Sequence, residues 1–201
     1  MPKVGLSRLY LAKYSADTLG NVTYTGGKRS ARMVNYSTSI ASTDNNDFYA
    51  DDELAESETG RFLSGTVSVE TAEIDTEMSA MILGLTPVEL TDEELGADAT
   101  EYVYDDDAKS QNLGMGIIEK RISHGKTTWR PIVFRKVCFN IPDNSATTQG
   151  ESISWQTDSA TAKIMRDDSS KHAWKSEATF DTVEKADRYI RLKLNMLEET
   201  P

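Results

Sequence analysis

Hydrophobic and polar residues alternate along much of the chain with a period of two, which is typical of half-buried β-strands. Polar and glycine-containing stretches interrupt the alternation and favour turns. Gly26-Gly27 is expected to end the second strand, and Pro131 is expected to mark a bulge or a sheet edge. The strands predicted in this way cover residues 4–14, 22–25, 31–40, 62–70, 102–104, 112–123, 126–140, 151–157, 160–166 and 171–180.

Two pairs of these strands are close enough along the chain to form β-hairpins. The first pair spans residues 112–140 and is expected to turn at His124-Gly125, because both residues tolerate a left-handed backbone. Its second arm is apolar on both faces, which predicts a strand that is covered on both sides. The second pair, which spans residues 160–180, is expected to turn at residues 167–170.

A helical period replaces the alternation in the middle of the chain. Asp75 and Glu77 favour the start of this helix, and Gly84 and Pro87 favour its end. The stripe that would face the core contains Ile74, Met78, Met81, Ile82 and Leu85. These positions predict a helix that packs against a sheet.

A second helix is predicted over residues 182–197. Asp181 and Glu184 resemble a capping box at its start. Its apolar stripe consists of Val183, Ala186, Ile190, Leu194 and Leu197. The order of all these elements predicts a single mainly β domain over residues 1–201, an antiparallel sandwich or barrel with a central and a C-terminal helix on its flank.

Residues 41–61 are predicted to be a long loop. A structureless connection of this length is uncommon in a compact domain and is usually functional. Phe48 and Tyr49 lie near its centre, next to acidic residues. Aromatic side chains on such a loop indicate that another surface covers them.

The charge is unevenly distributed along the chain. The net charge is −11, yet residues 44–60 hold seven acids and residues 89–107 hold nine, with no base in either segment. The remaining residues carry 22 bases and 17 acids. This pattern lacks the concentrated basic face of a nucleic-acid binder. The two acidic segments, including an arm at residues 88–109, are either solvated loops or surfaces complementary to the basic part of a neighbouring copy.

Catalytic and metal-binding chemistry is sparse. The two histidines, His124 and His172, are expected to be exposed, and the single cysteine, Cys138, is expected to be a small core residue. The spacing of these residues does not suit an ordinary zinc site. Aspartates at residues 44–47 and 105–107 could bind calcium, but they lack the EF-hand spacing. Gly114-Met115-Gly116 indicates close backbone approach within a strand. We therefore expect no enzyme activity, no cofactor and no metal.

The chain has neither an apolar run long enough to cross a bilayer nor the apolar start of a secretory signal. We therefore expect no membrane contact, and folding in the cytoplasm.

Several segments, taken in order, resemble the major tail proteins (tail tube proteins) of long-tailed bacteriophages with non-contractile tails. The segments that carry the resemblance are residues 2–6, 48–56, 74–85, 112–116, 129–131, 133–139 and 150–157. The chain lacks the Trp-Phe pair of that family near the end, and no immunoglobulin-like extension is expected.

The resemblance implies a β-sandwich with a flanking helix that assembles as stacked hexameric rings. DNA would pass through the lumen during ejection, without specific binding. The implied partners are further copies of the chain, a tape-measure protein, and terminator and tip proteins. The implied location is the tail of the virion, after synthesis in the cytoplasm of the host bacterium.

The resemblance also implies candidate interaction residues. A loop over residues 36–58 would reach a neighbouring subunit through Tyr36, Phe48, Tyr49, Asp51, Asp52, Glu53, Leu54 and Glu56. Acidic candidates for the lumen or for contacts between rings are Glu101, Asp105, Asp106 and Asp107. Two alternatives stay open, a β-sandwich adhesin or receptor-binding module and the related tube of a contractile secretion system.

Overall fold

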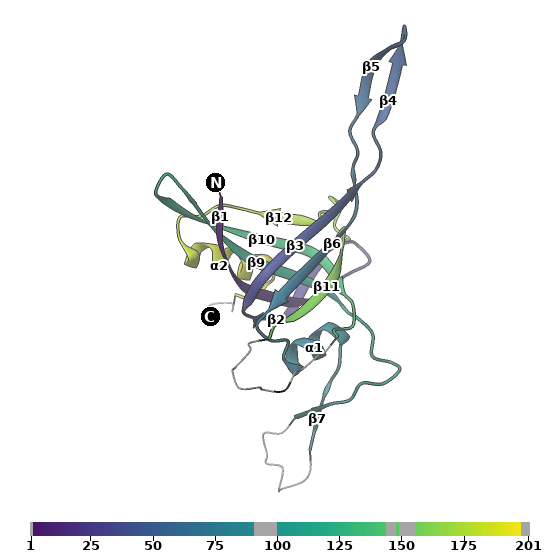
Figure 1. Cartoon of the computed structure of the whole chain (residues 1–201). Helices are drawn as coiled ribbons and strands as arrows, with labels where there is room; N and C mark the ends of the chain where they lie inside the picture. The colour runs from purple at the N-terminus through teal and green to yellow at the C-terminus, as the bar shows by residue number, and fades with distance from the viewer. Residues whose placement is uncertain (1, 91–99, 144–147, 149–155, 198–201) are drawn as a thin grey trace.

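A computed structural model describes residues 2–90, 100–143, 148 and 156–197 (Figure 1). Within these residues the chain forms twelve strands and two helices. Their bounds in chain order are β1 (Lys3–Ala16), β2 (Val22–Ala31), β3 (Met33–Ser42), β4 (Asn46–Ala50), β5 (Glu53–Glu58), β6 (Phe62–Thr71), α1 (Thr76–Leu83), β7 (Pro87–Glu89), β8 (Thr100–Tyr102), β9 (Asn112–Ser123), β10 (Lys126–Phe139), β11 (Asp158–Met165), β12 (Lys175–Glu177) and α2 (Val183–Lys193).

Most of the strands belong to one antiparallel sheet. Its order is β2-β1-β9-β10-β11-β6-β3. β12 also pairs with β10, on the same edge as β11 but at different residues of β10. The sheet curls, so β3 at one end of this order contacts β1 near the other end (Figure 1). The predicted class, mainly β with antiparallel strands and two helices, is confirmed.

The main core lies inside the curled sheet, where the inward-facing side chains of its strands meet. α1 packs into one end of this core, as its apolar stripe predicted. Asp75 caps the helix by accepting a hydrogen bond from the backbone N of Met78 at 2.6 Å, and Gly84 ends it with φ +70°. Fully buried core members include Leu9, Leu11, Met78, Ile82, Leu113, Met115, Ile117, Phe134 and Ile164.

α2 covers the outer face of the sheet over β9 and β10. This second core contains Tyr10, Ala12, Tyr24, Ile118, Val133, Ala186, Ile190 and Leu194. A Cβ atom at Gly114 would lie 2.5 Å from the ring of Tyr24, and one at Gly116 would lie 2.5 Å from Ile190. The predicted close approach at these glycines is confirmed, because the helix packs directly on the backbone of β9.

The hairpin predicted over residues 112–140 is confirmed as β9 and β10. His124 and Gly125 form its turn with φ values of +49° and +75°. Both faces of β10 are covered, since Val133 packs under α2 and Phe134 packs inside the curled sheet. The bulge or sheet edge predicted at Pro131 is wrong. Pro131 pairs in register with Ile118 of β9, the backbone N of Ala178 donates to its carbonyl at 3.3 Å, and the register shift of β10 lies between Phe134 and Val137.

The second predicted hairpin is wrong. β11 and β12 do not pair with each other, but lie one after the other along the same edge of β10. Pairing with β10 places both strands in the large sheet and buries Ala160, Ala162 and Ile164 of β11, which a short isolated hairpin could not do. The strand break predicted at Gly26-Gly27 is also wrong, because β2 continues through it to Ala31 with a shift in register.

Three smaller expectations are corrected and one falls outside the described residues. α2 is capped by Thr182, whose side chain accepts from the backbone N of Lys185 at 3.3 Å, whereas Asp181 forms an ion pair with the Lys185 side chain. The short strand β8 ends at Tyr102, where a strand over residues 102–104 was predicted. Cys138 is half-buried instead of buried. The strand predicted over residues 151–157 lies mostly in the segment that the structure does not describe.

Candidate assembly surface

The predicted loop over residues 41–61 is an ordered β-hairpin. It continues the ribbon formed by β3 and β6: Ser42 pairs with Phe62, and the backbone N of Thr43 donates to the carbonyl of Arg61 at 2.9 Å. β4 and β5 then pair out to the turn, and the arm projects away from the curled sheet (Figure 1). The prediction of a loop over these residues is therefore wrong, because Asn46–Ala50 and Glu53–Glu58 pair as two strands around a tight turn.

The turn at the tip of this arm is acidic. Asp51 and Asp52 have φ values of +53° and +61°, the left-handed backbone of a type I′ turn, which aspartate tolerates better than most residues. Glu53 follows directly, and the only basic side chain that pairs within the arm is Arg61, which contacts Glu58 at the base. The tip therefore presents carboxylates to the surroundings.

Large apolar side chains accompany the acids near the tip. Phe48 and Tyr49 are each 63% exposed and Leu54 is 54% exposed. Tyr49 pairs directly with Leu54 across the two strands, so these two side chains lie side by side on one face of the arm. None of the three belongs to either core of the body, the name used here for the curled sheet with its two helices. Within the described chain, nothing covers them.

The structure separates the candidate residues into three places. Phe48, Tyr49, Asp51, Asp52, Glu53, Leu54 and Glu56 all lie on the β4–β5 arm. Tyr36 lies in β3, half-buried against the main core. Glu101 in β8 and the exposed Asp105, Asp106 and Asp107 lie after the β7–β8 hairpin, at the other end of the body from the arm (Figure 1).

Tyr36 belongs to a buried charge cluster that sequence analysis missed. Its hydroxyl donates to Glu119, a carboxylate that is 1% exposed. Lys3 Nζ lies 2.9 Å from the same side chain, and Arg121 Nη2 lies 2.6 Å from it. This cluster joins β1, β3 and β9 and so closes the curled sheet. The sequence feature that could have indicated this cluster is Glu119 itself, a glutamate that directly follows the apolar run Gly116-Ile117-Ile118.

The pKa of Glu119 reflects two opposed effects. Burial alone would raise it, but the hydrogen bonds from Tyr36, Lys3 and Arg121 outweigh burial and hold it below its ordinary value. The pKa of the Tyr36 hydroxyl is raised by burial and by the neighbouring carboxylate. At neutral pH Glu119 is therefore ionised and the Tyr36 hydroxyl stays protonated, so the hydrogen bond between them links β3 to β9.

β3 is an edge strand without charge. It pairs with β6 along one side only, and its ten residues from Met33 to Ser42 contain no acid, no base and no proline. Monomeric proteins usually protect such edges with lysine, proline or bulges. In β3 the register against β6 shifts near its two ends, between Met33 and Asn35 and between Ala41 and Ser42. This edge has backbone groups that can pair with another chain.

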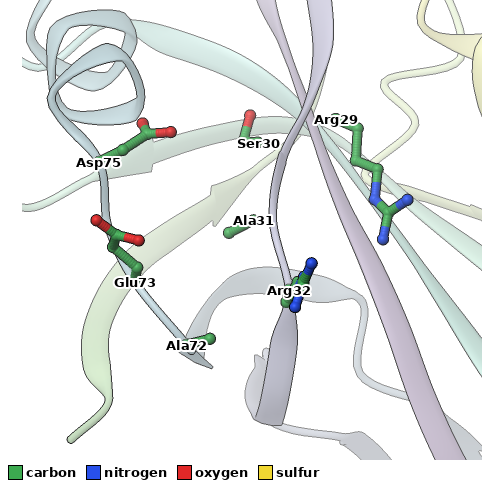
Figure 2. A pocket seen from close by; sticks show the side chains of 7 residues that line it. All are labelled: Arg29, Ser30, Ala31, Arg32, Ala72, Glu73 and Asp75. Atoms are coloured by element: carbon green, nitrogen blue, oxygen red, sulfur yellow. The ribbon is translucent and has the colours of Figure 1, made fainter.

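An open pocket lies at the end of the β3–β6 ribbon that is opposite the arm. Its volume is about 610 Å³. Figure 2 shows Arg29 and Arg32 on the wall formed by β2 and its connection to β3, and Glu73 and Asp75 on the wall that leads into α1. Neither guanidinium forms an ion pair with any residue that the structure describes.

Catalytic features do not emerge from the described residues. Within them, no group of three or more His, Cys, Asp or Glu side chains is arranged to hold a metal ion. His124 and His172 are exposed, as predicted. None of the helices in the described ranges is long and apolar enough to cross a membrane.

The chain matches no protein-family model and no curated protein.

Proposed function

We propose that this chain is a structural protein that assembles with copies of itself into stacked hexameric rings. These rings would form the tail tube of a bacteriophage with a long non-contractile tail, the conduit for DNA ejection. The observation that carries the proposal is the β4–β5 arm, whose exposed Phe48, Tyr49 and Leu54 lie far from both cores. The family resemblance of the sequence selects this assembly among those that the arm could serve.

The energetic argument starts from the exposed apolar groups. Burying one large apolar side chain gains about 1.5–3 kcal/mol. The arm offers three such groups on a scaffold whose turn and strand pairing already order it, so association costs little further ordering. The uncharged edge strand β3 would give the body a second surface for association, through pairing with a strand of another copy.

The acidic residues around Glu101 and Asp105–Asp107 would face the lumen or the next ring. A negative wall repels DNA phosphates within about 8–10 Å at physiological salt, so that DNA slides without binding. These four side chains are candidates because all are exposed. A density map of assembled tubes with a lysine-rich lumen would overturn this part of the proposal. A tape-measure protein inside the tube and terminator and tip proteins at its ends complete the proposed partners.

The test is the mass of the purified protein by light scattering and its appearance by negative-stain microscopy, at rising concentration. We expect rings or tubes with an open lumen for the natural sequence. Phe48→Ala with Tyr49→Ala should abolish them and leave a folded monomer, because the arm adds nothing to either core. Leu63→Ala is the matched control, since Leu63 is equally exposed but lies on β6 at the base of the arm.

Unaltered tubes from the Phe48/Tyr49 variant would contradict the role given to the arm. A natural chain that remains monomeric at every concentration would contradict self-assembly. In that case the exposed aromatic groups would favour the adhesin alternative, and binding to glycans or cell surfaces would be measured next.

A further inference from the structure

The surface that receives the arm can be inferred from the structure. The arm and the pocket lined by Arg29 and Arg32 lie at opposite ends of the same β3–β6 ribbon. β3 leaves the pocket at Met33 and enters the arm after Ser42, and β6 returns from Phe62 to Thr71. A ten-residue strand spans about 33 Å, so the two sites are separated by the height of the body.

This arrangement has a direct geometric consequence. A second copy displaced along the ribbon axis brings its acidic tip toward the pocket of the first, where Arg29 and Arg32 form one wall. The arm from Thr43 to Asp51 can extend about 27 Å beyond the body, which is long enough to enter a pocket on the next copy. The two contacting surfaces differ, so each added copy leaves a free tip and a free pocket, and the contact repeats.

The chemistry of the two surfaces is complementary. The tip carries the carboxylates of Asp51, Asp52 and Glu53 next to the ring of Tyr49. Arginine binds carboxylates through paired hydrogen bonds and also stacks on aromatic rings. Arg29 and Arg32 are exposed and have no ion-pair partner among the described residues, so both are available for these contacts.

The rest of the pocket is compatible with this occupant. Ala31 and Ala72 are small and leave room for an aromatic ring within the volume of about 610 Å³. Asp75 caps α1, and its carboxylate lies on the same wall as Glu73 (Figure 2). Glu73 is exposed on the opposite wall and would repel an acidic tip, so the tip must lie against the arginine wall (Figure 2).

We propose that the β4–β5 tip of one copy docks in the Arg29/Arg32 pocket of a second copy, head to tail. The inference rests on the proposed self-assembly and specifies which surface accepts the arm. It makes the acidic tip and the arginine wall of the pocket the two halves of one repeating contact along the stack.

The experiment reverses the charge on each half. Arg29→Asp with Arg32→Asp should lower the assembled fraction at least tenfold at a concentration where the natural chain assembles, and so should Asp51→Lys with Asp52→Lys. A chain that carries all four substitutions should assemble again, because the pairing is restored with opposite signs. Lys126→Asp with Lys171→Asp is the matched control, since it makes the same charge change at two exposed lysines outside the pocket.

A variant that removes one negative charge from the pocket should favour assembly instead of weakening it. Glu73→Gln removes the carboxylate that faces the arginine wall and should lower the concentration needed for assembly about threefold or more. Thermal unfolding of every variant, followed by circular dichroism, separates a lost contact from a lost fold. Restoration by the fourfold variant gives a second check, because a misfolded chain would not regain assembly.

Three outcomes would overturn the inference in distinguishable ways. If the Arg29/Arg32 variant assembles normally while the Phe48/Tyr49 variant does not, the arm docks elsewhere and the proposed function survives. If the natural chain never assembles, self-assembly and this contact fail together. Loss of assembly without restoration by the fourfold variant would also refute direct pairing of tip and pocket.

Discussion

Gly116 has no side chain, and this allows α2 to pack closely against the backbone of β9. Ile190 of α2 is fully buried and lies against the backbone of β9 at this residue. Gly116→Ala would place a Cβ atom 2.5 Å from Ile190 Cγ2. We expect a loss of about 1–3 kcal/mol in the free energy of unfolding, measured in urea, since overpacking forces the helix outward.

Gly5→Ala is the control for this prediction. The added Cβ would lie 3.5 Å from Lys120, an ordinary contact, so the free energy of unfolding should change by less than about 0.5 kcal/mol. Equal effects of the two substitutions would mean that strand propensity, and not contact with the helix, determines the cost.

Glu119 predicts a pH dependence of stability. Its folded pKa is below the ordinary value of 4.5, so the stabilisation is complete above about pH 4.5 and is lost as pH falls through the folded pKa. Glu119→Gln should lower the free energy of unfolding by about 2 kcal/mol at pH 7, because it leaves the cations around it without a carboxylate. The difference from the natural chain should shrink as pH falls below 4.5.

Urea unfolding at pH 7, 5 and 3.5 would measure that difference. Glu101→Gln serves as a control because Glu101 is exposed on β8 and has no ion-pair partner among the described residues. A gap between natural and Glu119→Gln proteins that stays constant down to pH 3.5 would show that the carboxylate charge is not the source of the stabilisation.

At the scale of elements, the β4–β5 arm is independent of the body. All its strand residues are exposed, and it contributes nothing to either core. Replacing residues 44–60 with Asn-Gly should close β3 and β6 with a two-residue turn between Thr43 and Arg61. We expect the midpoint of thermal unfolding to change by only a few degrees, and assembly to be lost.

The outcome that would contradict this independence is a shortened chain that no longer unfolds cooperatively. Near-ultraviolet circular dichroism would report whether the stacked rings of Phe62 and Trp174, 4.5 Å apart at the base of the arm, remain packed. Retained signal with lost assembly would assign the arm to association alone.

The predictions were correct for elements that neighbouring residues in the sequence determine. The turn at His124-Gly125 and the apolar stripe of α1 are encoded by neighbouring residues, so they could be predicted from the sequence. The partner of a strand is not a local property. The apolar alternation of β11 is compatible with many partner strands, and only the long edge of β10 decides that β11 and β12 lie end to end along it.

At the scale of the whole molecule, the two ends of the β3–β6 ribbon differ in charge. The charged side chains of the tip are all acidic, whereas the other end carries Arg29 and Arg32 across from Glu73 and Asp75. Attraction between exposed charges is screened at about 10 Å in 0.1 M salt and about 3 Å in 1 M salt. We therefore expect the rate of assembly to fall about tenfold between 0.05 and 0.5 M sodium chloride, measured by light scattering.

The final assembled mass should change less than the rate, because the apolar contacts of Phe48, Tyr49 and Leu54 are not screened. A rate that is independent of salt would show that the acidic tip does not guide association. A rate that rises with salt would indicate repulsion between the acidic segments as the dominant long-range force.

The sequence by itself determined the mainly β class, the two helices, the hairpin of β9 and β10 and the exposed aromatic segment near Phe48, because periodicity and turn chemistry are local. Only the tertiary structure decided that this segment is an ordered arm, that Tyr36 and Glu119 close the curled sheet, and that Arg29 and Arg32 lie at the far end of the ribbon. These features depend on strand pairing between residues distant in the chain, which no local pattern specifies.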